Sequence, residues 1–500
     1  GGLSVGQFSG TGTLTIADGG MVSTNTSARF GGALPGFPNG RGTLTVTGTG
    51  STMTVGTDLT LGGAGTASTG TATIANGGVV NVAGKTVIAN AAGSTGTLNI
   101  GSAAGDAPVA PGTLSIQNKL GVKKSGVGPV SSGIGSAAGS NGTVIVTGAG
   151  ATWTESDGIT VGDLGTGTLL IENGGVVSTG SSAVGVEGTG TVTVTGMNST
   201  WTNTGGFSVG QFTGTGTLTI ADGGMVSTQT SARFGGAIPG NPNGRGTLTV
   251  TGTGSTMTVG TDLTLGGAGT ASTGTATIAD GGVVNVAGNT IIARSAGATG
   301  TLNIGSAAGD APVAPGTLSS SSLAFGDGDG RLTFNHTDLS KNYSFDPAIS
   351  GNGVIGHDAG YTSLTGDSSG FTGTTTVDGG TLAIQNKLGG DVSVMSGGTL
   401  GGSGILTGDL LVSSGATVAP GMSIGTLTVN GNYEQQSTST LDIEIAPDGS
   451  ANDLLAVGGT ARLAGTLTAQ SENGSLLTPA AAGTATSPKV YTILTASGGV

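Results

Sequence analysis

One short unit recurs along most of the chain and constrains the fold more than any other feature. It opens with a Gly-Thr pair and continues as a strand-like run, as in GTLTIADGGMVS at residues 12–23. Successive units begin 23 to 30 residues apart, with one longer step of 46 residues. The opening glycines are Gly12, Gly42, Gly70, Gly96, Gly142, Gly167, Gly190, Gly216, Gly246, Gly274 and Gly300. A repeat of this length without a helical pattern is typical of a solenoid.

Each unit carries the pattern of a half-buried strand followed by a turn. Leu14 and Ile16 alternate with threonines, which is the two-residue period of a strand with one buried face. We therefore expect Leu14, Ile16 and their copies Leu218 and Ile220 to point inward and the threonines to point outward. The segment Asp18-Gly19-Gly20 then supplies turn residues, because glycine adopts positive φ without steric cost.

A single unit has too few apolar residues to close a core, so the units must stack to bury a continuous apolar column. We therefore predict an all-β fold, a right-handed parallel β-helix (a solenoid) of roughly 20 stacked coils. Composition agrees with this fold, since 106 of 500 residues are glycine and only 3% are aromatic. A solenoid also accommodates this length without dividing into separate globular cores.

Charge and cysteine content exclude several function classes. The chain has 27 acidic and 14 basic residues, a net charge of −13, and no basic cluster that would bind nucleic acid. It has no cysteine, so a disulfide framework or a thiolate metal site is excluded. No apolar window is long enough to cross a bilayer as a helix. Because the sequence opens in the middle of a repeat, we expect it to be a piece of a longer protein.

Residues 3–115 are duplicated at 207–319 with 11 differences in 113 positions. Several differences conserve volume, as a packed core requires, and we expect the polar and charged ones to mark outward positions. Within the first copy, the Pro-Gly-rich segment 32–40 is predicted to be a protruding loop. Between the copies, the longest step contains the most basic segment, 117–124, which is interpreted as an extra coil or a loop.

Trp153 and Trp201 occupy the slot that Met53 and Met257 fill in other units. Tryptophan in a repeat can form an aromatic platform for sugars, or it can fill the core. We favour core packing, because methionine replaces tryptophan in the same slot.

One segment is similar to a protease motif. The sequence GDSSG at 366–370 is similar to the Gly-Asp-Ser-Gly motif of serine proteases, but an extra serine interrupts it. Only His336 and His357 are available as bases, and nothing in the sequence places either beside Ser368. Because a catalytic triad is defined by geometry, we interpret this segment as a turn.

Three further patterns are interpreted structurally. The sequence GDGDG at 326–330 lacks the later glutamate of a calcium loop, so a turn is favoured. Asp442 and Glu444 share one face of a strand, and without an aromatic cleft we read them as a solvated edge rather than a glycosidase pair. Asn-Gly-Arg at 39–41 and 243–245 is interpreted as an exposed turn, with receptor docking as the alternative. We assign no catalytic, cofactor-binding or metal-binding residues, and no cofactor.

The repeat resembles units found in passenger regions of bacterial type V secretion proteins, the autotransporters. The resemblance rests on the pattern Gly-Thr-(Leu/Val)-Thr-Val-Thr-Gly-x-Gly-Ser-Thr-(Trp/Met)-Thr and on a change of pattern near residue 320. Beyond that point the segments that resemble autotransporter-associated β-strand repeats are 332–337, 343–345, 349–353, 364–366, 371–382, 398–404 and 418–427. Two C-terminal segments, 453–457 and 491–494, extend the match.

The resemblance implies a division into three segments. Residues 1–320 form the glycine-rich array with its tandem duplication, 321–430 form the strand repeats, and 431–500 form an autochaperone-like passenger segment that stops before the membrane barrel.

The resemblance also implies a function. It predicts a passenger displayed at the bacterial cell surface or outer membrane, or secreted, that acts as a non-enzymatic rigid stalk or adhesin. Its partners would be a host matrix protein, a glycan or a cell surface, and its own C-terminal outer-membrane barrel. The alternatives are an enzymatic passenger, polysaccharide-active or proteolytic, and a secretion scaffold for an N-terminal effector.

Overall fold

A computed structural model describes residues 1–32, 39–63, 65, 67–102, 109–117, 132–236, 243–267, 269, 271–447, 449–472 and 490–500. All regular secondary structure in these described ranges is β-strand. The chain divides into two compact units. The first unit comprises Gly1–Ala276 and Gly281–Gly300, and the second comprises Thr277–Asp280 and Thr301–Val500.

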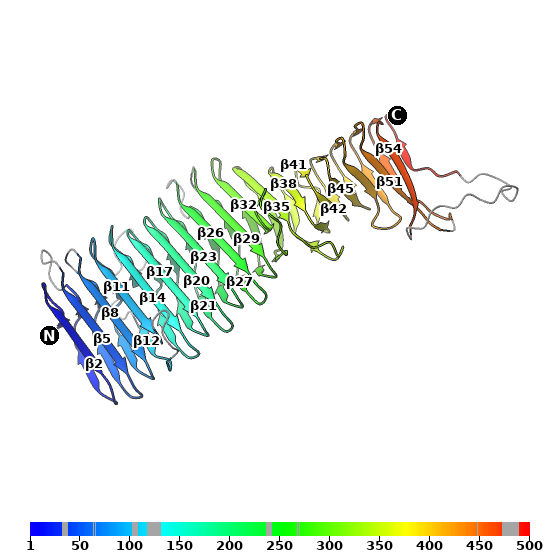
Figure 1. Ribbon diagram of the computed structural model, residues 1–500. Helices are drawn as coiled ribbons and strands as arrows, with labels where there is room; N and C mark the ends of the chain where they lie inside the picture. The colour runs from blue at the N-terminus through cyan, green and yellow to red at the C-terminus, as the bar shows by residue number, and fades with distance from the viewer. Residues whose placement is uncertain are drawn as a thin grey trace. The chain divides into compact units, whose positions relative to one another are not determined.

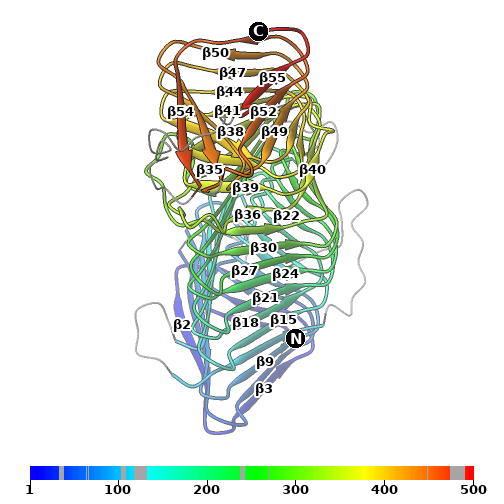
Figure 2. The same ribbon diagram turned by 90° about the vertical axis from the view of Figure 1, so that its right-hand side faces the viewer.

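The first unit is a stack of coils in which each coil adds one strand to each of three parallel sheets (Figure 1). The first sheet contains β1 (Leu3–Val5), β4 (Ala28–Phe30), β7 (Leu59–Leu61), β10 (Thr86–Ile88), β13 (Ser132–Ile134), β16 (Ile159–Val161), β19 (Ser182–Val184), β22 (Phe207–Val209), β25 (Ala232–Phe234), β28 (Leu263–Leu265) and β31 (Asn289–Ile292). The second sheet contains β2 (Thr11–Ile16), β5 (Arg41–Thr47), β8 (Thr69–Ala75), β11 (Thr95–Ile100), β14 (Asn141–Thr147), β17 (Thr166–Glu172), β20 (Thr189–Thr195), β23 (Thr215–Ala221), β26 (Arg245–Thr251) and β29 (Thr273–Ala279). The third sheet, stacked in Figure 2, contains β3 (Met21–Thr24), β6 (Thr52–Val55), β9 (Val79–Val82), β12 (Thr113–Ile116), β15 (Thr152–Glu155), β18 (Val176–Thr179), β21 (Thr200–Asn203), β24 (Met225–Thr228), β27 (Thr256–Val259) and β30 (Val283–Val286).

The alternation of the second sheet follows the sequence prediction. Leu218 and Ile220 of β23 are fully buried, whereas Thr219 between them is partly exposed. Ile16 is buried, and Leu14 of β2 is half-buried. On the outward face, threonines of consecutive coils align in one row: Thr13, Thr43, Thr71, Thr97, Thr143, Thr168, Thr191, Thr217 and Thr247. The predicted inward and outward faces are therefore confirmed.

Turns between the sheets depend on left-handed backbone at fixed positions. Asp18 and Gly19 have φ of 52° and 80° after β2, as the turn prediction requires. At the corner between the first and second sheets, Gly62 has φ of 68°. A Cβ atom at Gly62 would lie 2.3 Å from the carbonyl oxygen of Thr95 in the next coil. Glycine at this corner is thus needed both for the dihedral angle and for the close approach of the neighbouring coil.

Both tryptophans lie in the core, as the sequence interpretation favoured. Trp153 is 1% exposed and Trp201 is 0% exposed, like Met53 and Met257 in the equivalent slot. The ring of Trp201 packs edge-on against Phe207, with ring centroids 5.0 Å apart.

Two predictions fall wholly or partly outside the described residues. They are the protruding loop of segment 32–40, of which residues 33–38 are not described, and the basic segment 117–124, of which only residue 117 is described.

The second unit continues the coil pattern with shorter strands. Its long sheet contains β32 (Thr299–Gly305), β35 (Asp329–Asn335), β38 (Val354–Ala359), β41 (Thr374–Val377), β44 (Asp391–Val394), β47 (Leu410–Val412), β50 (Tyr433–Gln435) and β53 (Ala461–Arg462). A second sheet contains β36 (Ser344–Phe345), β39 (Tyr361–Leu364), β42 (Gly380–Ile384), β45 (Gly398–Gly402), β48 (Thr417–Pro420), β51 (Thr440–Ile445) and β54 (Thr466–Ser471). A third contains β40 (Asp367–Ser368), β43 (Lys387–Leu388), β46 (Ile405–Leu406), β49 (Thr426–Val429), β52 (Leu454–Val457) and β55 (Leu494–Ala496). The remaining strands of this region are β33 (Thr317–Ser319), β34 (Ser322–Phe325) and β37 (Ala348–Ser350).

Aromatic side chains fill the interior of the second unit near its start. Phe334 packs edge-on against Phe345 with ring centroids 5.1 Å apart, and Phe325 lies 5.8 Å from Phe371. All four rings are buried. These side chains supply a large part of the buried apolar area in this part of the second unit.

The strand pairing establishes the fold class. Neighbouring strands within each sheet pair in parallel, coil upon coil, which is the arrangement of a parallel β-helix. In the described ranges the second sheet of the first unit has 10 strands and the long sheet of the second unit has 8, which makes 18 strands against the roughly 20 coils predicted from the repeat. The predicted all-β solenoid is confirmed, and the segment boundaries at 320 and 430 stay predictions. Among the described residues, no helix is long and apolar enough to cross a membrane.

Candidate binding site

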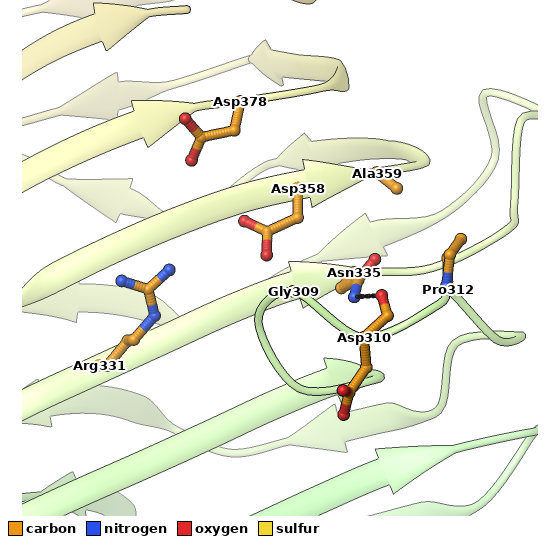
Figure 3. Close-up of a pocket in the computed structure, with 8 residues that line it drawn as sticks. All are labelled: Gly309, Asp310, Pro312, Arg331, Asn335, Asp358, Ala359 and Asp378. Carbon is orange, nitrogen blue, oxygen red and sulfur yellow. Dashed lines mark hydrogen bonds between the residues drawn. The ribbon is translucent and has the colours of Figure 1, made fainter.

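A hollow of about 420 Å³ opens on the surface of the second unit (Figure 3). Its walls come from β35, from β38, from the residue that follows β41, and from the segment before β33. The lining residues are Gly309, Asp310, Pro312, Arg331, Asn335, Asp358, Ala359 and Asp378. One guanidinium and three carboxylates therefore line the hollow.

An irregularity in the strand register places Asp358 in this hollow. Phe334 of β35 pairs with His357 of β38, but the next residue, Asn335, pairs with Ala359. Asp358 is therefore the extra residue of a β-bulge, a feature that redirects a side chain and is common beside functional sites. Figure 3 shows its carboxylate on the same side of the sheet as the Asp378 carboxylate.

The position of the Arg331 side chain depends on a hydrogen bond within its own strand and on a glycine in the next coil. Its Nε donates a hydrogen bond of 3.1 Å to the Oγ1 of Thr333 on the same strand. In the next coil, a Cβ atom at Gly356 would lie 2.4 Å from Nη2 of Arg331. A larger residue at 356 would displace the guanidinium, so glycine there helps to position the cation of the hollow.

Asn335 fixes the segment that forms the opposite wall. Its Nδ2 donates to the carbonyl oxygens of Ala307 and Asp310, over 2.9 and 2.8 Å. The Asn335 side chain is 2% exposed, so these bonds are shielded from water. The wall is thus held by a buried amide that satisfies two backbone carbonyls.

Burial and the neighbouring charges act in opposite directions on Asp358. Burial raises the pKa of the Asp358 carboxyl above its usual value, and the charge of Asp378 adds to this effect. The Arg331 guanidinium and a hydrogen bond from the backbone of Gly309 lower the same pKa. The hollow therefore combines strong acceptors with one strong donor, an arrangement suited to binding polar groups through hydrogen bonds.

Ser368 of the protease-like motif is a structural residue. It is 1% exposed, and its Oγ accepts a 2.9 Å hydrogen bond from the backbone N–H of Ile349. His336 and His357 instead face Thr362 and each other. The structure therefore does not bring a base to Ser368. The turn interpretation is right for residues 369–370 and wrong for Asp367 and Ser368, which form strand β40.

The acidic residues of GDGDG and of β51 lie at the surface. Asp327 and Asp329 of GDGDG are exposed at the start of β35. Asp442 and Glu444 share the outward face of β51, where Asp442 accepts hydrogen bonds from Thr468 and Gln470. Within the described ranges, no group of three or more His, Cys, Asp or Glu side chains is arranged to hold a metal ion.

The two Asn-Gly-Arg segments precede strands in equivalent positions of the duplicated blocks. Asn39 and Asn243 are exposed and have positive φ of 73° and 81°. Arg41 and Arg245 then begin β5 and β26. This geometry agrees with the turn interpretation.

Comparison with known proteins gives the sequence relationship. No family model matches the chain. It is 36% identical over 133 residues to the uncharacterized lipoprotein YdeK of Escherichia coli strain K12, covering 25% of this chain and 10% of the relative. It is 35% identical over 193 residues to the adhesin BmaC autotransporter of Brucella suis biovar 1 strain 1330, covering 34% of this chain and 5% of that protein. The chain resembles an autotransporter passenger. The matched region covers only a small part of the length of each of these two relatives.

A solved structure also aligns along most of the chain. It is the TibC-catalyzed hyper-glycosylated TibA55-350 fragment, which aligns over 85% of this chain and 97% of that fragment, at 14% identity and a TM-score of 0.32. The broad resemblance to autotransporter passengers that the repeat pattern indicated is confirmed by the similarity to the autotransporter adhesin. The finer assignment of 321–430 to autotransporter-associated β-strand repeats stays a prediction.

Proposed function

We propose that this chain is a stretch of a surface-displayed or secreted autotransporter passenger that acts as an adhesin and not as an enzyme. The observation that carries the proposal is the 35% identity over 193 residues to an autotransporter adhesin. The stacked coils form a scaffold that holds surface side chains in fixed positions, and the hollow around Arg331 is the binding feature of the second unit. Its partners are molecules on a host surface or a neighbouring cell, and in the complete protein it is joined to its own outer-membrane barrel.

The charges of the hollow favour one class of partner. The three carboxylates repel an anionic ligand and so disfavour its binding, and the Arg331 guanidinium repels a simple cation. A neutral group rich in hydroxyls avoids both penalties, because hydroxyls donate to carboxylates and accept from a guanidinium. We therefore propose that the hollow binds a neutral glycan.

An array of glycans and matrix proteins, probed with the full chain, tests this proposal. We expect binding to a neutral glycan, and we expect Arg331→Gln and Asp358→Asn each to weaken it by about tenfold or more, since hydrogen bonds to charged groups contribute about 1.5–3 kcal/mol. Asp327→Asn is the matched control, because it removes one exposed carboxylate outside the hollow and should leave binding unchanged.

The possible outcomes separate the parts of the proposal. Binding to a neutral glycan that survives both hollow variants would place the binding surface elsewhere on the coils. Binding to cationic ligands alone would contradict the assigned role of Arg331. Absence of binding to every glycan and matrix protein would contradict the adhesin function of this segment.

A further inference from the structure

A directed chain of hydrogen bonds runs through the interior of the second unit. The backbone N–H of Asp338 donates to Nδ1 of His336 over 3.3 Å, so Nδ1 is the acceptor and Nε2 carries the proton. Nε2 of His336 lies 2.9 Å from Oγ1 of Thr362, which in turn lies 3.2 Å from Nε2 of His357. Nδ1 of His357 lies 2.8 Å from the carbonyl oxygen of Gly379 and must donate to it.

The two fixed ends determine the direction of every bond between them. Burial lowers the pKa of both histidines, so both are neutral near pH 7. His336 then donates to Thr362, and the Thr362 hydroxyl donates to His357, so the two histidines are in opposite tautomers. His336, His357 and Thr362 are all 0% exposed. We name this set of three side chains the histidine latch.

An added proton on either histidine would disrupt a hydrogen bond of the latch. On Nδ1 of His336 it would face the N–H of Asp338, setting one donor against another. On Nε2 of His357 it would turn the Thr362 hydroxyl proton away from its acceptor. Either proton would also bring a charge into a dry interior, and two would repel each other across rings whose centroids are 6.3 Å apart.

The charged and titratable groups around the latch do little to accommodate that proton. The ring of Tyr343 packs against His336 at a tilt of 54°, with ring centroids 4.8 Å apart, and burial holds the pKa of its hydroxyl above the usual value. Asp338 is the nearest carboxylate of the His336 segment, and it raises the pKa of His336 less than burial lowers it. The groups beyond these on the packed elements are Arg331, Lys341, Asp346, Tyr361, Asp358 and Asp378, of which Arg331, Asp358 and Asp378 line the hollow.

We propose that the histidine latch is an acid-sensitive joint of the second unit, which is closed at neutral pH and opens as the pH falls from about 5 toward 4. Opening releases residues 336–343 from β39 and loosens the turn at Gly379. Asp358 follows His357 in the sequence, and Asp378 precedes Gly379, whose carbonyl oxygen accepts from His357. The hollow therefore loses its shape when the latch opens. This inference concerns conformation and stands whether or not the hollow binds a glycan.

The direction of the pH effect follows from the histidines being neutral in the fold. Burial lowers the pKa of both His336 and His357 from 6.5 to about 4. Their contribution to stability is therefore complete above pH 6.5 and is lost as the pH falls toward 4. For one histidine, the opening equilibrium at pH 5 should exceed that at pH 7 by about 20-fold.

Two measurements on the full chain test the latch. The protein has only two histidines, so selectively labelled imidazole signals in NMR report on the latch alone. Hydrogen exchange read by mass spectrometry, corrected for intrinsic rates, measures protection of peptides over 336–345, 355–364 and 376–382. We expect both imidazoles to remain neutral down to about pH 5, and protection of these peptides to fall about 20-fold per histidine between pH 7 and pH 5.

A pair of variants at Thr362 isolates the bridging hydroxyl. Thr362→Ser keeps the hydroxyl and should retain protection at pH 7, whereas Thr362→Val removes it and should lose protection there. Ordinary titration near pH 6.5 with unchanged protection would overturn the proposal. So would titration below pH 5 without loss of protection. If Thr362→Val does not fold, the imidazole titration of the unmodified chain still decides between these results.

Discussion

Replacement of Trp201 tests whether the tryptophan slot is core or a sugar platform. Trp201 is 0% exposed, packs edge-on against Phe207, and donates its indole N–H to Oγ1 of Thr179 over 3.2 Å. Truncation of a buried tryptophan to alanine leaves a large cavity and costs about 3–5 kcal/mol. We therefore expect Trp201→Ala to lower the free energy of unfolding by that amount.

Trp201→Met is the matched variant, because methionine fills the same slot at 53 and 257. Thr179 still receives a hydrogen bond from Ser182 and donates to Oδ1 of Asn203, so losing the indole leaves no orphaned acceptor. We expect this change to cost less than about 2 kcal/mol, because methionine is flexible and fills irregular gaps.

Urea titration followed by circular dichroism measures both variants, and hydrogen exchange shows whether the loss is centred on β18, β21 and β24. A cost below about 1 kcal/mol for Trp201→Ala would contradict the core assignment. Equal loss of glycan binding in both variants at unchanged stability would instead support a sugar platform.

Two further predictions concern charge and local stability. Burial raises the pKa of Glu155 from 4.5 to about 7, so its contribution to stability is complete below pH 4.5 and decreases by up to about 3 kcal/mol as the pH rises to 7. Glu155→Gln should remove this pH dependence from urea midpoints measured at pH 5 and pH 8. An unchanged pH dependence would show that Glu155 is not its source. Limited proteolysis in increasing denaturant should leave a resistant core from about residue 325 onward, because each buried aromatic side chain there removes about 150–250 Å² from water. A resistant core confined to the glycine-rich coils would show instead that those coils are the more stable part.

The sequence predicted the coil, the parity of its strands and the burial of its tryptophans, because all three depend on residue patterns within one unit. It did not predict the hollow, because Asp358 enters through a bulge and Gly356 matters only once Arg331 of the preceding coil lies against it. Predicting a contact between two coils requires the register in which their strands pair. The repeat pattern does not give that register where the repeat length changes.

The buried polar groups illustrate the same limit. Glu155 lies in the inward column beside Ile116, at a position that holds valine at 55 and 82. That exception could have been read from an alignment of the units, and it is stabilised by a hydrogen bond from Ser132. His336 and His357 are 21 residues apart, close to the length of one coil in this region, and this spacing was the available signal that they lie near each other in adjacent coils.

Two adjacent substitutions in β23 provide the most direct test of the stacked-coil account. Ile220 pairs with Val194 and Val250 inside the stack, whereas Thr219 pairs with Thr193 and Thr249 on its outer face. Ile220→Asp should bury an unpaired carboxylate and abolish hydrogen-exchange protection in its own coil and both neighbours, while Thr219→Asp should leave protection nearly unchanged. Equal loss of protection in the two variants, or greater loss in Thr219→Asp, would contradict the account.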